Sequence, residues 1–316
     1  MTAATLHSAR PASPRLLTQA LYRAAVAAGL APSAYNTQPW RWRLTGDAMD
    51  LYLDPDRMIG VRDPAGHLAM ISCGAALHHA RLTLAARGWR VTVTRRPGQG
   101  STHHVAHLHI DGPAPVSAGT ARLARAIRQR HTDLRPVTGS PIRPPDLRTI
   151  SQAFTSHDIS VHILRPDEVL ALTVAAAHAE HAEAAEAQWY EQLALWTGAG
   201  RIVGTVDRLR LPTRPGDHDR AATFAVLHGR GDQDIEWLHA GEALSTGWLV
   251  ATQLGMSALP FSAPIENTRA RETLRRAVPD LNHPYVMVRL GRHTSAASAA
   301  HSVRLDAAEI IGHHTP

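Results

Sequence analysis

Two segments of this chain are apolar around nearly the whole circumference of a helix, and each ends at a glycine. They run from His67 to Gly88 and from Ile235 to Gly255. A helix without a polar face has to be covered on all sides, so we expect both in the interior. The first contains C-G-A-A-L from Cys73 and the second A-G-E-A-L from Ala240, each followed by an apolar ladder. This echo predicts two related halves packed about an approximate two-fold axis.

The break between the halves falls in a proline-containing stretch over 112–117. We therefore expect a disordered tail at 1–15, a first half at 16–117 and a second half at 118–316. The second half contains a predicted long helix from Pro166 to about Leu195, followed by a stretch of poor periodicity up to Gly231. Stretches of this kind often cover a binding site, so we place a candidate lid at 166–231.

The remaining patterns predict an α+β chain with a mixed sheet flanked by helices. The expected helices cover 16–28, 119–130, 146–153 and 268–277, and the expected strands cover 40–44, 50–53, 89–94, 105–110, 159–164 and 285–290. Gly29 stands where a C′ glycine would end the first helix.

Composition excludes several classes of protein. All 33 basic residues are arginine and the formal charge is +6, but the arginines are scattered, which argues against a nucleic-acid partner. No apolar run reaches the roughly 18 residues of a membrane span, and the first 15 residues do not resemble a signal peptide. The single cysteine, Cys73, excludes an internal disulfide and reads as a small core residue. We expect a cytoplasmic protein.

The 21 histidines suggest a metal site, but their spacing does not support one. The densest group, around His107 and His109, alternates with apolar residues, so it reads as the polar face of a strand. His178 and His181 lack the spacing of a zinc-peptidase helix. We expect no metal.

The loop between the first helix and first strand carries unusual chemistry. The stretch A-P-S-A-Y-N-T-Q-P-W-R-W begins at Ala31 and presents the hydroxyl of Ser33 and the carboxamides of Asn36 and Gln38 between two prolines. These groups could satisfy the backbone of an ordinary turn. They could equally hold a planar ligand with polar edges.

The same stretch resembles the flavin-binding loop of the nitroreductase superfamily, where P-S-x-x-N-x-Q-P-W follows the first core helix. Further segments are similar to the Acg family of actinobacteria: D-P-A-G-H-L-A-M-I-S-C-G-A-A-L, R-H-T-D-L-R-P, W-L-H-A-G-E-A-L and F-S-A-P-I-E-N-T-R. They span the chain from Pro32 to about Arg304. The resemblance implies a nitroreductase-like fold that binds FMN at the interface of two subunits.

In such dimers one subunit supplies an R-[R/H]-[S/T] segment and the other the P-S loop. Here the first half has only the loop and the second half only Arg130-His131-Thr132. The resemblance therefore implies a pseudo-dimer within one chain, with one composite FMN site, and the chain itself would be a monomer or a homodimer.

The resemblance also assigns roles to individual residues. Arg130, His131 and Thr132, with Arg304 from the C-terminal tail, would hold the phosphate and ribityl chain. Pro32 and Ser33 would cover the ring edge, and Asn36 and Gln38 would fix the loop or the polar side of the flavin. A backbone N–H of Ser262 or Ala263 would face flavin N5.

One position departs from the pattern. Relatives carry Lys or Arg two residues after the Ser or Thr, where this chain has Leu134, and Arg135 is the neighbouring cation that could substitute. A positive group there stabilises the reduced flavin.

Two functional hypotheses follow. The first is an FMN-dependent oxidoreductase that takes hydride from NAD(P)H and reduces a nitro, quinone or similar planar acceptor. A variant of it is an oxidase or dehydrogenase that acts on a biosynthetic intermediate. The second is a non-catalytic protein that stores FMN beneath a lid. A structural protein without flavin would leave the composite site unexplained.

Overall fold

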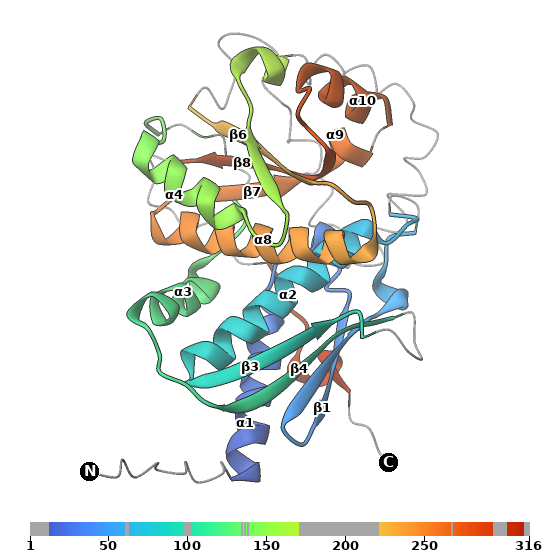
Figure 1. Ribbon diagram of the computed structural model, residues 1–316, viewed down its shortest axis with the longest axis vertical. Coiled ribbons are helices and arrows are strands. Elements are labelled where there is room, and N and C mark those ends of the chain that lie inside the picture. The colour runs from blue at the N-terminus through green and yellow to red at the C-terminus, as the bar shows by residue number, and fades with distance from the viewer. Residues whose placement is uncertain are drawn as a thin grey trace, which may run out of the picture.

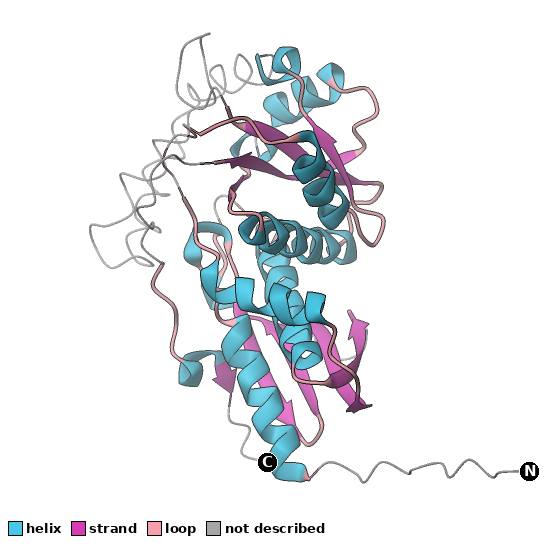
Figure 2. Ribbon diagram, turned by 90° about the vertical axis from the view of Figure 1, so that its left-hand side faces the viewer, coloured by secondary structure: helices cyan, strands magenta, loops and turns pink. Residues whose placement is uncertain are grey.

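The computed structural model describes residues 13–60, 63–97, 103–133, 135, 137, 139–170, 221–266, 268–292 and 302–312. Within these ranges the chain has an α+β fold, as predicted, with two sheets on either side of a central helix layer (Figures 1 and 2). Most of the predicted tail and lid, together with Leu134, lies outside the described residues.

The first sheet has the strand order β3-β4-β2-β1-β9. Neighbouring strands are antiparallel except β9, which runs parallel to β1 and makes the sheet mixed, as predicted. The elements of this part are α1 (Pro14–Ala28), β1 (Trp40–Thr45), β2 (Ala48–Leu53), α2 (His67–Ala86), β3 (Trp89–Arg95) and β4 (His104–Pro113), with short 3-10 turns at Ala34–Asn36 and Pro55–Arg57.

The second sheet has the order β5-β6-β8-β7 and is antiparallel throughout. The C-terminal segment then returns to the first sheet as α11 and β9. The elements are α3 (Ala118–Gln129), α4 (Pro144–Phe154), β5 (Ser160–Ile163), β6 (Thr223–Gly229), α8 (Asp234–Gln253), β7 (Ser257–Phe261), α9 (Ala263–Glu266), α10 (Thr268–Ala277), β8 (His283–Gly291), α11 (Ala307–Ile310) and β9 (Ile311–Gly312).

The two apolar segments form α2 and α8, which pack against each other between the sheets (Figure 1). They cross at two glycines. A Cβ on Gly74 would lie 2.1 Å from the carbonyl oxygen of Leu238, and one on Gly241 would lie 2.0 Å from that of Ile71. Only glycine permits such a close approach of two backbones. Gly74 and Gly241, which belong to the two similar segments noted in the sequence, therefore let the helices pack in contact.

The two halves share one topology. Asp234 stands 167 positions after His67, both helices contain 20 residues, and each is followed by a glycine with positive φ, Gly88 at 81° and Gly255 at 69°. Taken from β7, the second sheet has the order β7-β8-β6-β5, which corresponds to β3-β4-β2-β1 strand for strand. This correspondence supports the prediction that the chain consists of two related halves, and that prediction stays a proposal.

Three expectations differ from the structure. Gly29 is right-handed, with φ −59°, and is small for another reason: a Cβ there would lie 2.9 Å from Cδ1 of Ile310. Residues 257–261, which belong to none of the predicted strands, form the edge strand β7 because they pair with β8. Thr223–Gly229, inside the predicted lid, form β6 in the interior of the second sheet. Residues 223–229 are therefore not part of a lid, and residues 171–220 of the predicted lid lie outside the described residues.

Cys73 is a small core residue, as predicted. It is fully buried and its thiol donates to the carbonyl oxygen of Pro39 at 3.4 Å. Burial raises the pKa of the thiol, so the thiolate is disfavoured. No helix among the described residues is long and apolar enough to cross a membrane.

Candidate functional site

The loop between α1 and β1 carries backbone strain. Tyr35, Asn36 and Gln38 have φ angles of 51°, 60° and 52°, a region that residues with a side chain rarely adopt. Each such residue costs about 1–3 kcal/mol, and the cost is tolerated where surrounding contacts fix the conformation. Ser72 accepts a hydrogen bond from the N–H of Ala34 at 3.1 Å, and Ser33 accepts one from the N–H of Gln38 at 3.0 Å. The Ser33 hydroxyl therefore shapes the loop.

The two carboxamides tie this loop to the C-terminal tail. Asn36 donates to the carbonyl oxygen of Val303 at 3.0 Å, and its Oδ1 accepts from Nη1 of Arg304 at 2.5 Å. Gln38 accepts from the N–H of Leu305 at 3.0 Å. The structure thus brings Arg304 next to Asn36 and Gln38, although Arg304 lies more than 260 positions after both in the sequence.

Arg130 lies at the end of α3 and is 4% exposed. Its Nη2 donates to the carbonyl oxygen of Leu30 at 3.4 Å, and Nη2 of Arg304 donates to the same oxygen at 3.4 Å. The Arg130 guanidinium also lies 4.4 Å from the centre of the Trp248 ring. Its Nε and Nη1 are buried without a hydrogen-bond partner in the part of the chain that the structure describes.

These two arginines form a cation pair that has no carboxylate partner among the described residues. No carboxylate of the described residues forms an ion pair with Arg130 or Arg304. Burial, with the nearby charge of Arg304, lowers the pKa of Arg130 to about 9, and burial lowers that of Arg304 to about 10. A buried, unpaired charge is unfavourable, whereas a phosphate would satisfy both guanidinium groups through charge-assisted bonds.

His79 adjoins this pair and was not predicted from the sequence. Its side chain is fully buried on α2, its Nδ1 lies 3.3 Å from the carbonyl oxygen of Ala27, and its Nε2 has no partner among the described residues. Burial and the charges of His78, Arg130 and Arg304 hold its pKa well below the usual value. No sequence pattern identifies His79, because a histidine in an apolar helix is interpreted as a core residue.

The other described residues of the predicted arginine segment contact residues that are close to them in the sequence. His131 and Thr132 are half-buried, and Nδ1 of His131 lies 3.1 Å from the carbonyl oxygen of Gln129. Arg135 donates to the buried carboxylate of Asp133 through Nε at 2.9 Å and Nη2 at 2.5 Å, and this pairing raises the pKa of Arg135. Its charge is thus already partnered within the segment.

The loop after β7 meets the strained loop of the first half. The hydroxyl of Ser262 donates to Oε1 of Glu266, and the hydroxyl of Tyr35 donates to the same oxygen at 3.5 Å. Ala263 begins α9 directly after Ser262. Tyr35 and Glu266 were missed as contact residues, although both stand inside segments that carry the family resemblance.

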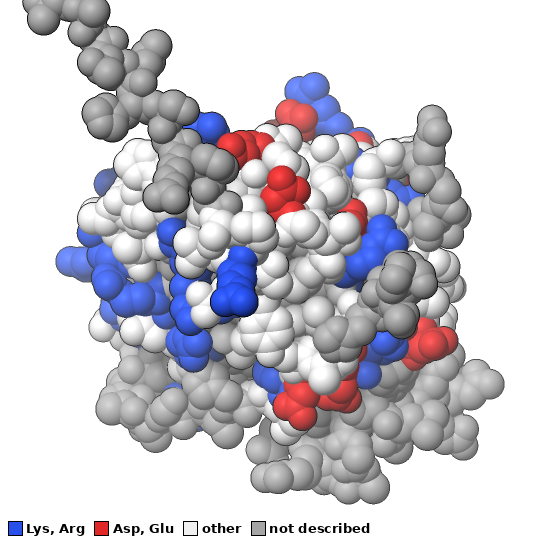
Figure 3. Space-filling model, turned by 90° about the horizontal axis from the view of Figure 1, so that it is seen from below, with Lys and Arg blue, Asp and Glu red and all other residues white. Residues whose placement is uncertain are grey.

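Two cavities of the described structure lie elsewhere. One of about 870 Å³ lies beside α1 and the tail, and one of about 360 Å³ lies beside α4 and β5. Among the described residues, no group of three or more His, Cys, Asp or Glu side chains is placed to hold a metal. On the face seen from below, the largest group of basic side chains lies at the left, further basic side chains lie at the right and the top, and acidic side chains lie mainly above and below the centre (Figure 3).

No family model matches the chain. Among curated proteins it is similar to "Putative NAD(P)H nitroreductase Rv3131" of Mycobacterium tuberculosis, with 29% identity over 83% of this chain and 81% of that protein. It is also similar to "Putative NAD(P)H nitroreductase acg" of the same organism, with 27% identity over 83% and 85%. Among solved structures, the FMN and NADPH-dependent nitroreductase NfnB from Sphigopyxis sp. strain HMH aligns over 54% of this chain and 88% of its own, with 14% identity and a TM-score of 0.41.

Proposed function

We propose that this chain, which belongs to the Acg-like branch of the nitroreductase superfamily, is an FMN-dependent oxidoreductase. It takes reducing equivalents from NAD(P)H and passes them to a nitro, quinone or similar planar acceptor. The observation that carries the proposal is the buried guanidinium of Arg130, whose Nε and Nη1 lack partners among the described residues and which has Arg304 beside it. That donor set fits a dianionic phosphate.

The residues present divide into those that hold the cofactor and those that shape its site. Arg130 and Arg304 bind the phosphate, and His131 and Thr132 stand beside Arg130 on the ribityl side. Asn36 and Gln38 hold the tail that carries Arg304. Pro32 and Ser33 would border the ring through the strained loop, and the backbone at Ser262 and Ala263 would face the flavin. When bound, FMN supplies the hydride chemistry at N5.

We further propose one FMN per chain, because the equivalent position on the other flank of the helix pair is filled. With the offset of 167, Ala75 corresponds to Glu242, Trp248 to Arg81, and Ser262 to Arg95. Glu242 is 1% exposed and accepts from Nε of Arg95 at 2.5 Å and Nη2 of Arg95 at 2.9 Å, with Nη2 of Arg81 at 3.5 Å. A carboxylate of the chain and two arginine side chains thus occupy the counterpart of the proposed flavin site.

The phosphate assignment is tested with Arg130→Ala. Losing the charge-assisted bonds should weaken FMN binding by about 1.5–3 kcal/mol, roughly 10- to 150-fold, in a fluorescence titration of the apoprotein. Arg128→Ala is the matched control, because Arg128 is exposed one residue before the end of the same helix. Equal FMN affinity in the two variants would remove Arg130 from the site.

Turnover is tested by anaerobic titration with NADH and NADPH. Loss of the flavin absorbance with either donor, followed by reoxidation with a quinone, is expected for an oxidoreductase. A flavin that dithionite reduces but neither nicotinamide reduces would favour the storage hypothesis. This experiment is decisive because the chain has Leu134 where relatives carry a cation that stabilises the reduced flavin. The neighbouring cation, Arg135, is already paired with Asp133.

A further inference from the structure

The ring of His79 has a fixed orientation and one nitrogen without a described partner. The side chain is fully buried on α2, and its Nδ1 lies 3.3 Å from the carbonyl oxygen of Ala27. A carbonyl oxygen only accepts, so Nδ1 carries the hydrogen and donates it. In a neutral ring of this tautomer, Nε2 has a lone pair and can only accept. No described residue donates to that nitrogen.

The surroundings of His79 keep its ring neutral. Burial is the main cause that holds its pKa well below the usual value, and the charges of His78, Arg130 and Arg304 act in the same direction. Burial persists when an anion neutralises the arginines, so the ring stays neutral in the loaded protein. The oxygens of a phosphate dianion only accept hydrogen bonds and cannot satisfy Nε2, whereas a hydroxyl group can.

The last turn of α1 and the residues after it hold His79 and both arginines. The carbonyl oxygen of Ala27 accepts from His79, and that of Leu30, three positions later, accepts from Nη2 of Arg130 and from Nη2 of Arg304. The unpaired acceptor of His79 thus shares this end of α1 with the unpaired donors of Arg130, Nε and Nη1. A ligand that satisfies both needs an anionic group and a hydroxyl close to it. FMN has this arrangement, because the ribityl carbon next to the phosphate-bearing carbon carries a hydroxyl.

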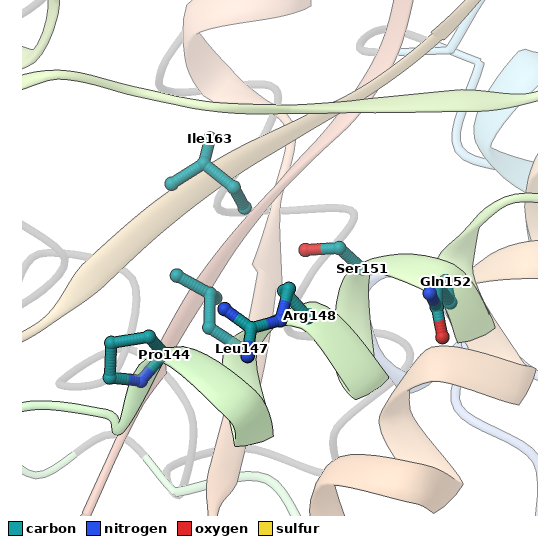
Figure 4. A pocket seen from close by; sticks show the side chains of 6 residues that line it. All are labelled: Pro144, Leu147, Arg148, Ser151, Gln152 and Ile163. Atoms are coloured by element: carbon teal, nitrogen blue, oxygen red, sulfur yellow. The ribbon is translucent and has the colours of Figure 1, made fainter.

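The equivalent position on the other flank of the helix pair is satisfied within the chain. With the offset of 167, His79 corresponds to Thr246, whose hydroxyl donates to the carbonyl oxygen of Glu242 at 2.9 Å. The groove between α4 and β5 gives a second contrast (Figure 4). Its charged residue, Arg148, is exposed, so water solvates the guanidinium and no ligand is required. At His79 burial excludes that solution.

We propose that Nε2 of His79 accepts a hydrogen bond from a ribityl hydroxyl of bound FMN. The proposal rests on the proposed FMN site and adds a second requirement to it. The two arginines select for an anion, and His79 selects for a hydroxyl beside that anion. The residue is therefore a specificity-determining contact for a phosphate that is attached to a polyol chain.

The test is a fluorescence titration of the full-length apoprotein with FMN at pH 8. Leucine is close to histidine in size and has no acceptor, so His79→Leu should weaken FMN binding about three- to tenfold. His79→Gln keeps an acceptor oxygen and should regain most of the affinity. His228→Leu is the matched control, because His228 also has a buried nitrogen without a described partner but lies on β6 in the second sheet. It should leave the affinity unchanged.

Sulfate separates the hydroxyl contact from the phosphate contact. It has the charge and shape of a phosphate group but carries no hydroxyl at this pH. In competition with FMN, sulfate should bind the unaltered chain and His79→Leu equally well and should bind Arg130→Ala less well. Equal losses of FMN and sulfate affinity in His79→Leu would overturn the proposal, because His79 would then act through the arginines.

Two further outcomes would overturn the proposal. One is an unchanged FMN affinity in His79→Leu; if Arg130→Ala still weakens binding, the FMN site itself stands, whereas an unaltered chain that takes up no FMN would refute the proposed function. The other is proton uptake on FMN binding, measured by calorimetry in two buffers of different ionisation enthalpy, that is larger in the unaltered chain than in His79→Gln. His79 would then become charged and donate to the phosphate. Urea unfolding of each apoprotein shows that the variants are folded.

Discussion

The helix pair α2 and α8 presents two equivalent flanks, and the chain treats them in opposite ways. On one flank, Arg130 and Arg304 have no carboxylate partner among the described residues, and Arg304 bonds to Asn36 of the strained loop. On the other, Glu242 brings its own carboxylate to Arg95 and Arg81. A covalently attached anion and a ligand anion are two solutions to the same problem of buried arginine charge. The comparison explains how a symmetric frame can hold one asymmetric site.

Removing the internal carboxylate should have the largest effect on stability. Glu242→Ala leaves Arg95 and Arg81 without their buried partner, and we expect the free energy of unfolding in urea to fall by about 3–5 kcal/mol. FMN affinity should stay unchanged under conditions where the variant is folded, because Glu242 lies on the opposite flank. Glu272→Ala, which breaks an exposed pair with Arg276, is the control and should cost less than about 0.5 kcal/mol. A comparable cost for both variants would mean that Glu242 is not a buried anion.

Changing the crossing point of the helices should affect both flanks together. Gly241→Ala places a Cβ against the backbone at Ile71, so the helices must move apart, and we expect a loss of about 3 kcal/mol in urea unfolding together with weaker FMN binding. In Gly119→Ala the nearest atom is Oγ of Ser117, 3.6 Å from the new Cβ, and the change should stabilise α3 by about 0.5–1 kcal/mol. An unaltered FMN affinity in Gly241→Ala would show that the cofactor site does not depend on the helix crossing.

The sequence predicted the helix pair well because its signal is local. Both helices are apolar on every face and end at a glycine, so their bounds agree with α2 and α8 within a residue or two. The meeting of the two glycines was implicit in the echo around Cys73 and Ala240. The strands β1 to β4 were also predicted, since they alternate or follow clear turns.

The elements that were missed depend on distant partners. The edge strand β7 is five residues long and contains Pro260, so it is a strand only because β8 lies beside it. The strand β6 follows a stretch of poor sequence periodicity and was assigned to the lid. The buried ion pair of Glu242 was not predicted, because its main partner, Arg95, is 147 positions away in the sequence. The same difference applies to the site residues. The strained loop was recognised because its residues are contiguous in sequence, whereas the place of His79 beside the arginine pair depends on how distant elements pack.

The smallest expected effect is a pH dependence of stability at the approximate two-fold axis between the two flanks. His78 and Ser245 are equivalent positions of the two helices and contact each other there. Nδ1 of His78 lies 2.8 Å from Oγ of Ser245. Burial, with the nearby Arg81, lowers the pKa of His78 to about 4, although Glu242 opposes the shift. The unfolded chain, in which this histidine has a pKa near 6.5, therefore takes up the proton first as the pH falls. Stability is fully present above about pH 6.5 and is lost towards pH 4.

Between pH 7 and pH 5 this single group should remove about 2 kcal/mol of stability. His78→Gln keeps a neutral hydrogen-bonding side chain, so urea unfolding at the two pH values should show a smaller loss in the variant by that amount. His109→Gln is the control of opposite sign, because the half-buried His109 has its pKa raised by the hydrogen bond with Asp111 and contributes stability at low pH. An equal loss in His78→Gln and the unaltered chain would mean that the pKa of His78 is not lowered in the folded protein.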